Sequence, residues 1–239
     1  THPLSSSRIS DAFNSAEGIS EEGTKQDSLE FGLMKARLEV YYENIPANSL
    51  RLFESKVDDS PSDANIYGLA LAHKKNNNFD KSINLLDKLI QKYPKNLVIN
   101  TTKVDILLSY DKFNEALNLV NQFLEISPKN YPLSISKSKV LLAMERYFES
   151  EEIIRDQLLR KNDDPELWLL LSEIQRNSQN IIGYHQSRAE YFLLLGQDDK
   201  ALNQLEFALQ LTQNNFQVSE SLMNKIVEIK KNLSSARGL

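Results

Sequence analysis

The feature of the sequence that most constrains its fold is a spacing of 34 residues that recurs in three separate columns. Aromatic residues, large aliphatic residues and prolines each repeat at this step. The columns are Phe79, Phe113 and Tyr147; Leu86, Val120 and Ile154; and Pro94 and Pro128. Three columns in one register indicate an internal repeat. A repeat of this length predicts stacked units, each of which packs on its neighbours.

Composition narrows the structure of each unit. The 239 residues include only 7 glycines and 7 prolines, which is too few for the many tight turns of a β-sandwich or barrel. The net charge of −5, without a basic stretch, argues against a nucleic-acid partner. No apolar run approaches the roughly 20 residues that a membrane-spanning helix needs. The absence of cysteine excludes disulfides, thiol nucleophiles and cysteine-based zinc sites.

In the 34-residue register the chain resembles the tetratricopeptide repeat (TPR) family over most of its length. With Asp63 at position 1, Ala70 lies on a first helix, Ser82 lies on a second helix, and Pro94 ends the unit. Val104 departs from the family pattern, which prefers a small residue there. The resemblance implies an all-α fold: a TPR α-solenoid, that is, a right-handed superhelix of about four to six antiparallel helix pairs, with a C-terminal capping helix.

The same register divides the chain into five parts. We expect a tail of an upstream catalytic domain at 1–16, a linker at 17–28, a degenerate TPR-like helix pair at 29–61, TPR repeats at 62–213, and a capping helix at 214–239. The degenerate pair is predicted to comprise helices at 29–42 and 48–57.

Two features of the C-terminal half refine this division. Asp164 and Pro165 predict an N-cap and first helical turn. A helix at about 182–195 is predicted to serve two consecutive units, because the register shifts there. In the last segment the apolar residues fall at helical spacing, and the lysines are expected on its solvent side. They are Leu222, Ile226, Ile229 and Leu233, and Lys225, Lys230 and Lys231.

No local catalytic motif is present. The three histidines, His2, His73 and His185, are too far apart for HExxH, and the sequence has neither a phosphate-binding loop nor a Gly-x-Ser-x-Gly elbow. The carboxylates alternate with lysines, as on solvated helix faces. We expect His73 and Trp168 to pack in the core, and Arg188 to contact Tyr184 one turn back. A catalytic constellation assembled only by the fold stays open.

The candidate binding site is the groove formed by the first helices. Register positions 2, 5, 9, 12 and 13 face this groove in the TPR family. They comprise Tyr67, Leu71, Lys74, Lys75, Thr101, Asp105, Leu108, Ile135, Lys139, Leu142, Leu169, Glu173 and Arg176. This mixture of apolar and charged groups suits a protein or peptide. Tyr67 and Leu71 stand where TPR adaptors that hold chaperone C-termini have Lys and Asn, which argues against that adaptor class.

Three segments carry a narrower resemblance. The opening Thr1-His2-Pro3, with Arg8-Ile9, is similar to the segment that closes the catalytic domain of HExxH zinc metallopeptidases. Residues 185–191 resemble the last TPR unit of bacterial periplasmic proteases of the BepA type. Residues 35–38 and 50–54 fit the first helical pair of the same family.

This resemblance implies a non-catalytic TPR domain of a periplasmic zinc metalloprotease. The domain would dock substrates, outer-membrane protein assembly components or the attached catalytic domain. The zinc cofactor and the metalloendopeptidase activity would belong to the parent polypeptide, and this chain would hold neither catalytic nor metal-binding residues. His2 is expected either to approach the metal in the intact parent or to be a tail residue. The alternatives are a free-standing TPR scaffold or adaptor unconnected to proteolysis, and an intrinsic helical hydrolase.

Overall fold

The computed structural model describes residues 28–212 and 215–237, and these form twelve helices and no strand. The expectations for 1–16 and 17–27, including His2, concern residues outside this range. The helices are α2 (Leu29–Tyr42), α3 (Pro46–Asp59), α4 (Asp63–Lys75), α5 (Phe79–Lys92), α6 (Leu97–Ser109), α7 (Phe113–Ile126), α8 (Tyr131–Ala143), α9 (Tyr147–Leu158), α10 (Pro165–Asn177), α11 (Ile181–Leu194), α12 (Asp198–Leu211) and α13 (Phe216–Arg237).

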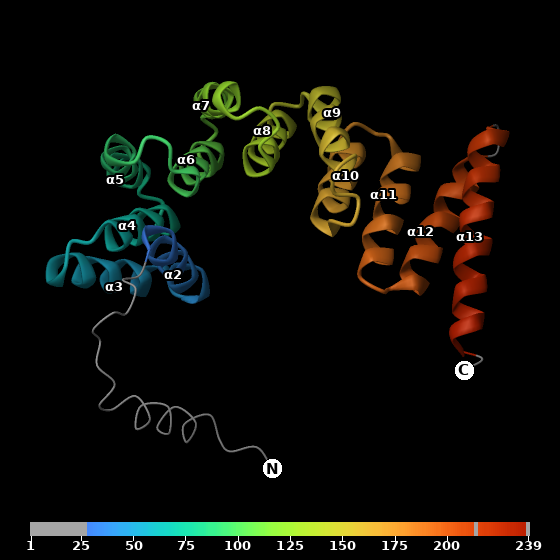
Figure 1. Cartoon of the computed structure of the whole chain (residues 1–239), viewed down its shortest axis with the longest axis horizontal. Coiled ribbons are helices and arrows are strands. Elements are labelled where there is room, and N and C mark those ends of the chain that lie inside the picture. The colour runs from blue at the N-terminus through green and yellow to red at the C-terminus, as the bar shows by residue number, and fades with distance from the viewer. Residues whose placement is uncertain (1–27, 213–214, 238–239) are drawn as a thin grey trace, which may run out of the picture.

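The helices stack into an open arc (Figure 1). From α5 to α8, the second helices α5 and α7 lie on the outer side of the arc, and the first helices α6 and α8 lie on its inner side. Most helices pack mainly on their neighbours in the chain, but α2 packs mainly on α4, and α6 also contacts α8. The all-α solenoid expected from the 34-residue spacing is confirmed. No helix within the described residues is long and apolar enough to cross a membrane.

The 34-residue period is also present in the backbone of the turns. Asn77, Asp111, Glu145 and Gln179, spaced by 34, all have φ between 58° and 61°. Each follows a first helix, and the next N–H donates to the carbonyl five residues earlier, for example Asn78 to His73 at 2.9 Å. This is the Schellman bond, which satisfies a helix carbonyl through one left-handed residue. The turn between paired helices is therefore built identically four times.

The predicted register shift is confirmed by the fifth such turn. Gly196, 17 residues after Gln179, has φ 67°, and Gln197 N donates to the Phe192 carbonyl at 2.9 Å. Half a repeat separates these turns, so α11 is second helix to α10 and first helix to α12. It packs extensively against both. Its bounds, Ile181–Leu194, differ by one residue from the prediction.

Small residues let the paired helices approach each other. Ser82 Oγ donates to the Ala70 carbonyl at 2.7 Å, and Ser150 Oγ donates to the Ser138 carbonyl at 2.8 Å. In the unit between them, Val104 is fully buried. Its partner position holds Ala116, which is also fully buried, so the larger residue on one helix faces a smaller one on the other.

Helix starts follow the expected capping chemistry. Asp164 caps α10 as predicted, because its carboxylate accepts the Glu166 N–H at 3.0 Å and Pro165 takes the first helical position. The helix predicted at 48–57 begins two residues earlier, at Pro46, and ends at Asp59. Proline needs no N–H partner in the first turn and therefore extends the helix start.

The last helix, α13, caps the solenoid. Leu222, Ile226 and Ile229 are buried against α11 and α12, and Leu233 packs at the edge of the same cluster. The prediction for Lys225 is wrong, because its ammonium pairs with Glu190 of α11 and the side chain is half-buried. Lys230 is exposed and pairs with Glu206 of α12 at 3.1 Å.

Candidate protein-binding surface

One position of the 34-residue repeat recurs on each first helix from α2 to α10, and we call these residues the register column. It contains Arg37, Leu71, Asp105, Lys139 and Glu173, each 34 residues from the next. The groove list from the sequence began at the second unit and therefore missed Arg37. One further step of 34 back from Leu71 would have found it. The column contains charges of both signs and one leucine, so no single small ion matches its whole length.

Most predicted groove residues are at least partly exposed. Lys139, Glu173 and Arg176 are exposed. Half-buried positions are Leu71, Lys74, Lys75, Thr101, Asp105, Leu108, Ile135, Leu142 and Leu169. Several of the apolar ones, such as Leu71 and Leu142, pack at the edges of buried clusters. The predicted set thus combines half-buried aliphatic groups with charged groups that are half-buried or exposed.

Tyr67 is the exception among the predicted residues, because it is fully buried. Its hydroxyl lies 2.8 Å from Thr102 Oγ1, and Thr102 Oγ1 donates its one proton to the Val98 carbonyl at 2.6 Å. Tyr67 therefore donates to Thr102. Tyr67 is a structural residue that links α4 to α6, and its ring contributes no docking surface.

The same network fixes Arg37 on the inner side of α2. Arg37 Nη2 donates to the Tyr67 hydroxyl at 2.7 Å and to Thr102 Oγ1 at 2.5 Å, and its Nε donates to Tyr67 at 3.1 Å. A cation held in this way loses little rotamer freedom when it binds an anion. Arg37 is thus a preorganised positive group at one end of the column.

Asp105 lies at the electrostatic centre of the groove. Its half-buried position raises the pKa of its carboxyl, while Lys74, Lys139 and Arg37 act in the opposite direction. Burial prevails, and the pKa is raised from its ordinary value of 3.8. The charges of Arg37 on α2, Lys74 on α4 and Lys139 on α8 thus act on one carboxylate that is itself incompletely solvated.

Lys75, although predicted for docking, serves the end of α2. Its ammonium donates to the carbonyl oxygens of Val40, at 2.6 Å, and of Glu43. These carbonyls belong to the last turn and cap of α2, where a cation is favourable. Lys75 therefore holds the first helix against α4, and a partner would have to compete with these bonds.

Of the two residues predicted for the core, His73 is buried and Trp168 is partly buried. His73 is 6% exposed, and burial, followed by the charge of Lys81, lowers its pKa. Trp168 packs at the edge of a buried cluster and donates from Nε1 to the Asn162 carbonyl at 2.8 Å.

The residues 185–191 on α11 form an aromatic and polar cluster. His185 Nδ1 lies 2.9 Å from Gln204 Oε1, and its ring contacts Tyr184 and Phe207. The predicted contact of Arg188 with Tyr184 is wrong. The Arg188 guanidinium lies over the rings that follow it in the chain, Tyr191 at 5.3 Å and Phe192 at 4.8 Å, because side chains one turn ahead are equally within reach.

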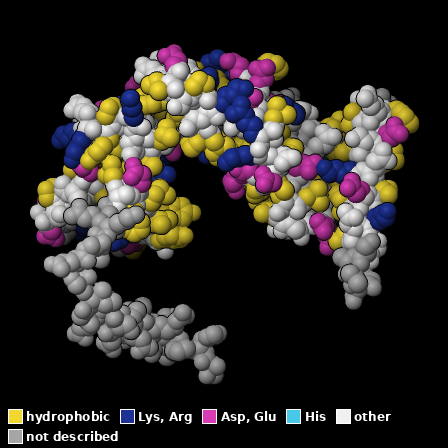
Figure 2. Space-filling model, in the orientation of Figure 1, with side chains coloured by type: hydrophobic (Ala, Val, Ile, Leu, Met, Phe, Trp, Pro, Cys, Tyr) yellow, Lys and Arg dark blue, Asp and Glu magenta, His cyan; other side chains and the backbone are white. Residues whose placement is uncertain are grey.

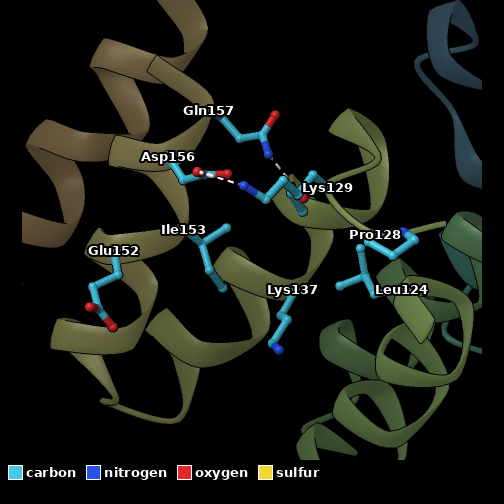
Figure 3. Close-up of a pocket in the computed structure, with 9 residues that line it drawn as sticks. Leu124, Pro128, Lys129, Lys137, Glu152, Ile153, Asp156 and Gln157 are labelled. Carbon is cyan, nitrogen blue, oxygen red and sulfur yellow. Dashed lines mark hydrogen bonds and ion pairs between the residues drawn. The ribbon is translucent and has the colours of Figure 1, made fainter. Parts of the chain in front are cut away.

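A separate hollow of about 490 Å³ lies between α7, α8 and α9 and was not anticipated from the sequence (Figure 3). Its polar groups bond mainly across its own walls: Lys129 Nζ lies 3.4 Å from Asp156 Oδ1, and Gln157 donates to Ser134 at 3.2 Å. Nowhere in residues 28–212 and 215–237 do three histidine or carboxylate side chains gather as metal ligands.

Comparison with known proteins agrees with this architecture. Residues 107–174 match the sequence profile of the tetratricopeptide repeat family. No curated protein matches the sequence. A tetratricopeptide repeat protein from Parabacteroides merdae ATCC 43184 has a TM-score of 0.51 at 13% identity, over 83% of this chain and 82% of that chain. The ArsTM double mutant of MamA RS-1 has a TM-score of 0.51 at 11% identity, over 74% of this chain and 99% of that chain.

At such low sequence identity the two structures support only the fold of this chain. Together with the fourfold repeated turn they identify the chain as an α-solenoid, in which residues 107–174 match the tetratricopeptide repeat family.

Proposed function

We propose that this chain is a non-catalytic protein-binding domain whose groove, formed by α4, α6, α8 and α10, docks a segment of a protein partner. The observation that carries the proposal is the column from Arg37 to Glu173, which combines charges of both signs with half-buried aliphatic groups on the same helices. Such a surface combines apolar area with charges that fix register, as protein recognition requires.

The N-terminal half of the groove favours an acidic partner segment. The charges of Arg37, Lys74 and Lys139 all act on the carboxylate of Asp105, and three cations against this one carboxylate give an excess of positive charge. An aspartate or glutamate of the partner would gain from three cations in a partly desolvated site. The C-terminal half, with Glu173 and Arg176 both exposed, has no such excess.

Charge reversal tests this binding mode. The double variant Lys74→Glu and Lys139→Glu should lower photo-crosslinking to the partner from a probe placed at Leu108 by at least about tenfold, as for loss of a desolvated ion pair. The matched control is Lys88→Glu with Lys81→Glu, which makes the same charge change at two exposed sites of the outer helix α5. Equal loss in both variants, or no loss in either, would contradict groove binding. Circular dichroism checks that both variants keep their helical content.

We further propose that the domain belongs to a periplasmic zinc metalloprotease of the BepA type and docks substrates or outer-membrane protein assembly components for it. The support is the order of the three similar segments, at residues 1–9, in the first helical pair, and at 185–191. Zinc and catalysis would lie in the preceding part of the parent, because this sequence contains no HExxH.

The parent gene and its metal content test this assignment. We expect an export signal and an HExxH segment upstream of Thr1, zinc in the intact parent, and loss of peptidase activity on chelation. This chain alone should bind no stoichiometric zinc. A coding sequence that starts near Thr1 without an export signal would instead favour a free-standing TPR scaffold or adaptor. Turnover or tight zinc binding by this chain alone would favour an intrinsic hydrolase.

A further inference from the structure

The helix α2 has a large apolar face that no other part of the described chain covers. Phe31 is 54% exposed, Met34 43%, Leu38 50% and Tyr42 72%. We call this the open face of α2; it also includes Tyr41 and continues into Ile45. Hydrophobic side chains gather beside α2, towards the hollow of the arc (Figure 2). A contiguous exposed apolar stripe on a helix marks an interaction surface.

The repeat register shows what this face does in the other units. Successive steps of 34 residues from Phe31, Met34 and Leu38 lead to the equivalent positions on the other first helices. These are Asn65, Gly68 and Ala72 on α4; Ile99, Thr102 and Ile106 on α6; Leu133, Ser136 and Val140 on α8; and Leu167, Leu170 and Ile174 on α10. All of these are buried except Asn65, which is half-buried. The same columns are therefore covered in four units and open in one.

The covering element in each unit is the preceding second helix. On α4 it is α3: the Asn65 amide donates to the Lys56 carbonyl at 3.2 Å, and the Asn76 amide donates to the Pro46 carbonyl at 2.7 Å. Between them, the Phe53 ring lies so close to Gly68 that an added Cβ would come within 2.0 Å of it. These three columns thus form a surface, here called a helix seat, on which a second helix packs. On α2 no helix among the described residues occupies this seat.

The surface on α2 differs from three of the four covered ones in its middle column. That column holds Gly68, Thr102 and Ser136 on α4, α6 and α8, which allows the second helix to approach closely, and Leu170 on α10. On α2 the same column holds Met34. Along α2 the large residues of the open face fall at 31, 34, 38 and 41, with Tyr42 beside the last, and these four have the alternating three and four spacing of a coiled-coil seam. Large side chains at this spacing pack well against a partner helix that carries large apolar side chains at the same spacing.

We propose that the occupant is a second copy of this chain, with the two α2 helices packed in parallel along their open faces. In the heptad frame Phe31 and Leu38 take position a, and Met34 takes position d. Glu30 then occupies position g and Lys35 the following position e, and both are exposed. In a parallel pair these positions meet between helices, so Glu30 of each copy lies beside Lys35 of the other. This contact is independent of what the groove binds.

The molecular mass in solution tests the pairing. The full chain should change from a monomer of 27.4 kDa towards twice that mass between about 1 and about 100 μM in sedimentation equilibrium. The double variant Met34→Asp and Leu38→Asp should stay monomeric over that range. The control Val227→Asp changes a residue that is 64% exposed on α13, far from α2 in the chain, and should keep the wild-type mass.

Cysteine substitution then tests the register, because the chain has no native cysteine. In a parallel pair, both Phe31→Cys and Leu38→Cys should form a disulfide between copies under mild oxidation. In an antiparallel pair centred on Leu38, the two copies of residue 31 would be about 21 Å apart and only Leu38→Cys would cross-link. Cross-linking of Leu38→Cys alone would support pairing with a second copy but would contradict the parallel orientation.

A monomeric mass at every concentration would overturn the second copy as occupant. Labelling of the same Leu38→Cys thiol then identifies what replaces it. Slow labelling in the monomer means that another part of the chain covers the face. Fast labelling means that the face is left for a different protein. Either result contradicts pairing of α2 with itself, and neither affects the charge-reversal test of the groove.

Discussion

At the scale of single residues, the repeated turns are held by backbone geometry more than by residue type. Asn77, Asp111, Glu145 and Gln179 all adopt the left-handed conformation, although only asparagine and aspartate tolerate it well. The Schellman bond and the packing of the two helices override the local preference of glutamate and glutamine. Strain is thus stored at 145 and 179, whereas Gly196 avoids it.

Exchange of these residue types should therefore have opposite effects. Gly196→Ala should lower the free energy of unfolding by about 1 kcal/mol, because an L side chain is strained at a φ of 67°. No neighbouring atom lies near the added Cβ, so no steric clash adds to this cost. Glu145→Gly should raise it by about 0.5 kcal/mol, since relief of strain slightly exceeds the added chain entropy. Urea unfolding followed by circular dichroism measures both. A loss of stability at Glu145→Gly would show that the turn is unstrained.

Asp105 gives a prediction in pH. Its folded pKa is raised above the unfolded value, so its ionisation opposes folding: the protonated form favours the folded state below pH 3.8, and that stability is lost as pH rises through the folded pKa. Asp105→Asn should therefore be more stable than wild type at pH 7, and this advantage should vanish towards pH 3.8. Urea midpoints measured across this range test the sign. A variant less stable than wild type at pH 7 would mean that the three cations outweigh burial.

At the scale of helices, stability comes from the columns in which neighbouring elements meet. Leu86 of α5 is fully buried in the cluster that it shares with α4 and α6. The exposed apolar residues, such as Leu159, lie at helix ends or on open faces. Sequence periodicity located Leu86 correctly because its column repeats in every unit. It missed the contact of Lys225 with Glu190, because that contact depends on how α13 crosses α11.

Truncation of a column residue should be costly only where the residue is buried. Leu86→Ala should lower the free energy of unfolding by about 2 to 5 kcal/mol, because it removes buried methyl groups and leaves a cavity. Leu159→Ala removes the same atoms at a site that is 87% exposed and should stay within about 0.5 kcal/mol of wild type. Denaturant unfolding compares the two, and similar losses would show that the register of α5 is wrong.

At the scale of the whole molecule, the solenoid has buried clusters that follow one another along the arc, and its two ends differ. The C-terminal end is covered by α13, whose apolar side packs on α11 and α12. The N-terminal end presents the open face of α2. In such a quasi-linear fold, each unit is stabilised by its immediate neighbours, so a change at one end acts mainly at that end.

Removal of the cap tests this locality. Deletion of residues 216–239 would expose Leu205 and Ala208, which are buried beneath α13. Hydrogen exchange should accelerate at least about tenfold in α12 and the adjoining part of α11, and should be nearly unchanged in α4 to α6. Uniform acceleration along the arc would instead indicate that the chain unfolds as one cooperative body.

The sequence by itself predicted the helix pairs, the shared helix α11 and the C-terminal cap, because each depends on a period or a local signal. The tertiary structure decided which members of the predicted groove are exposed. Tyr67 is buried and bonds to Arg37 and Thr102, and the half-buried carboxyl of Asp105 is influenced by cations on three other helices. Only the structure showed that no helix of the part of the chain it describes covers the open face of α2. The exposure of a side chain depends on which element packs over it. That element lies elsewhere in the chain or in another molecule, so local sequence patterns do not reveal it.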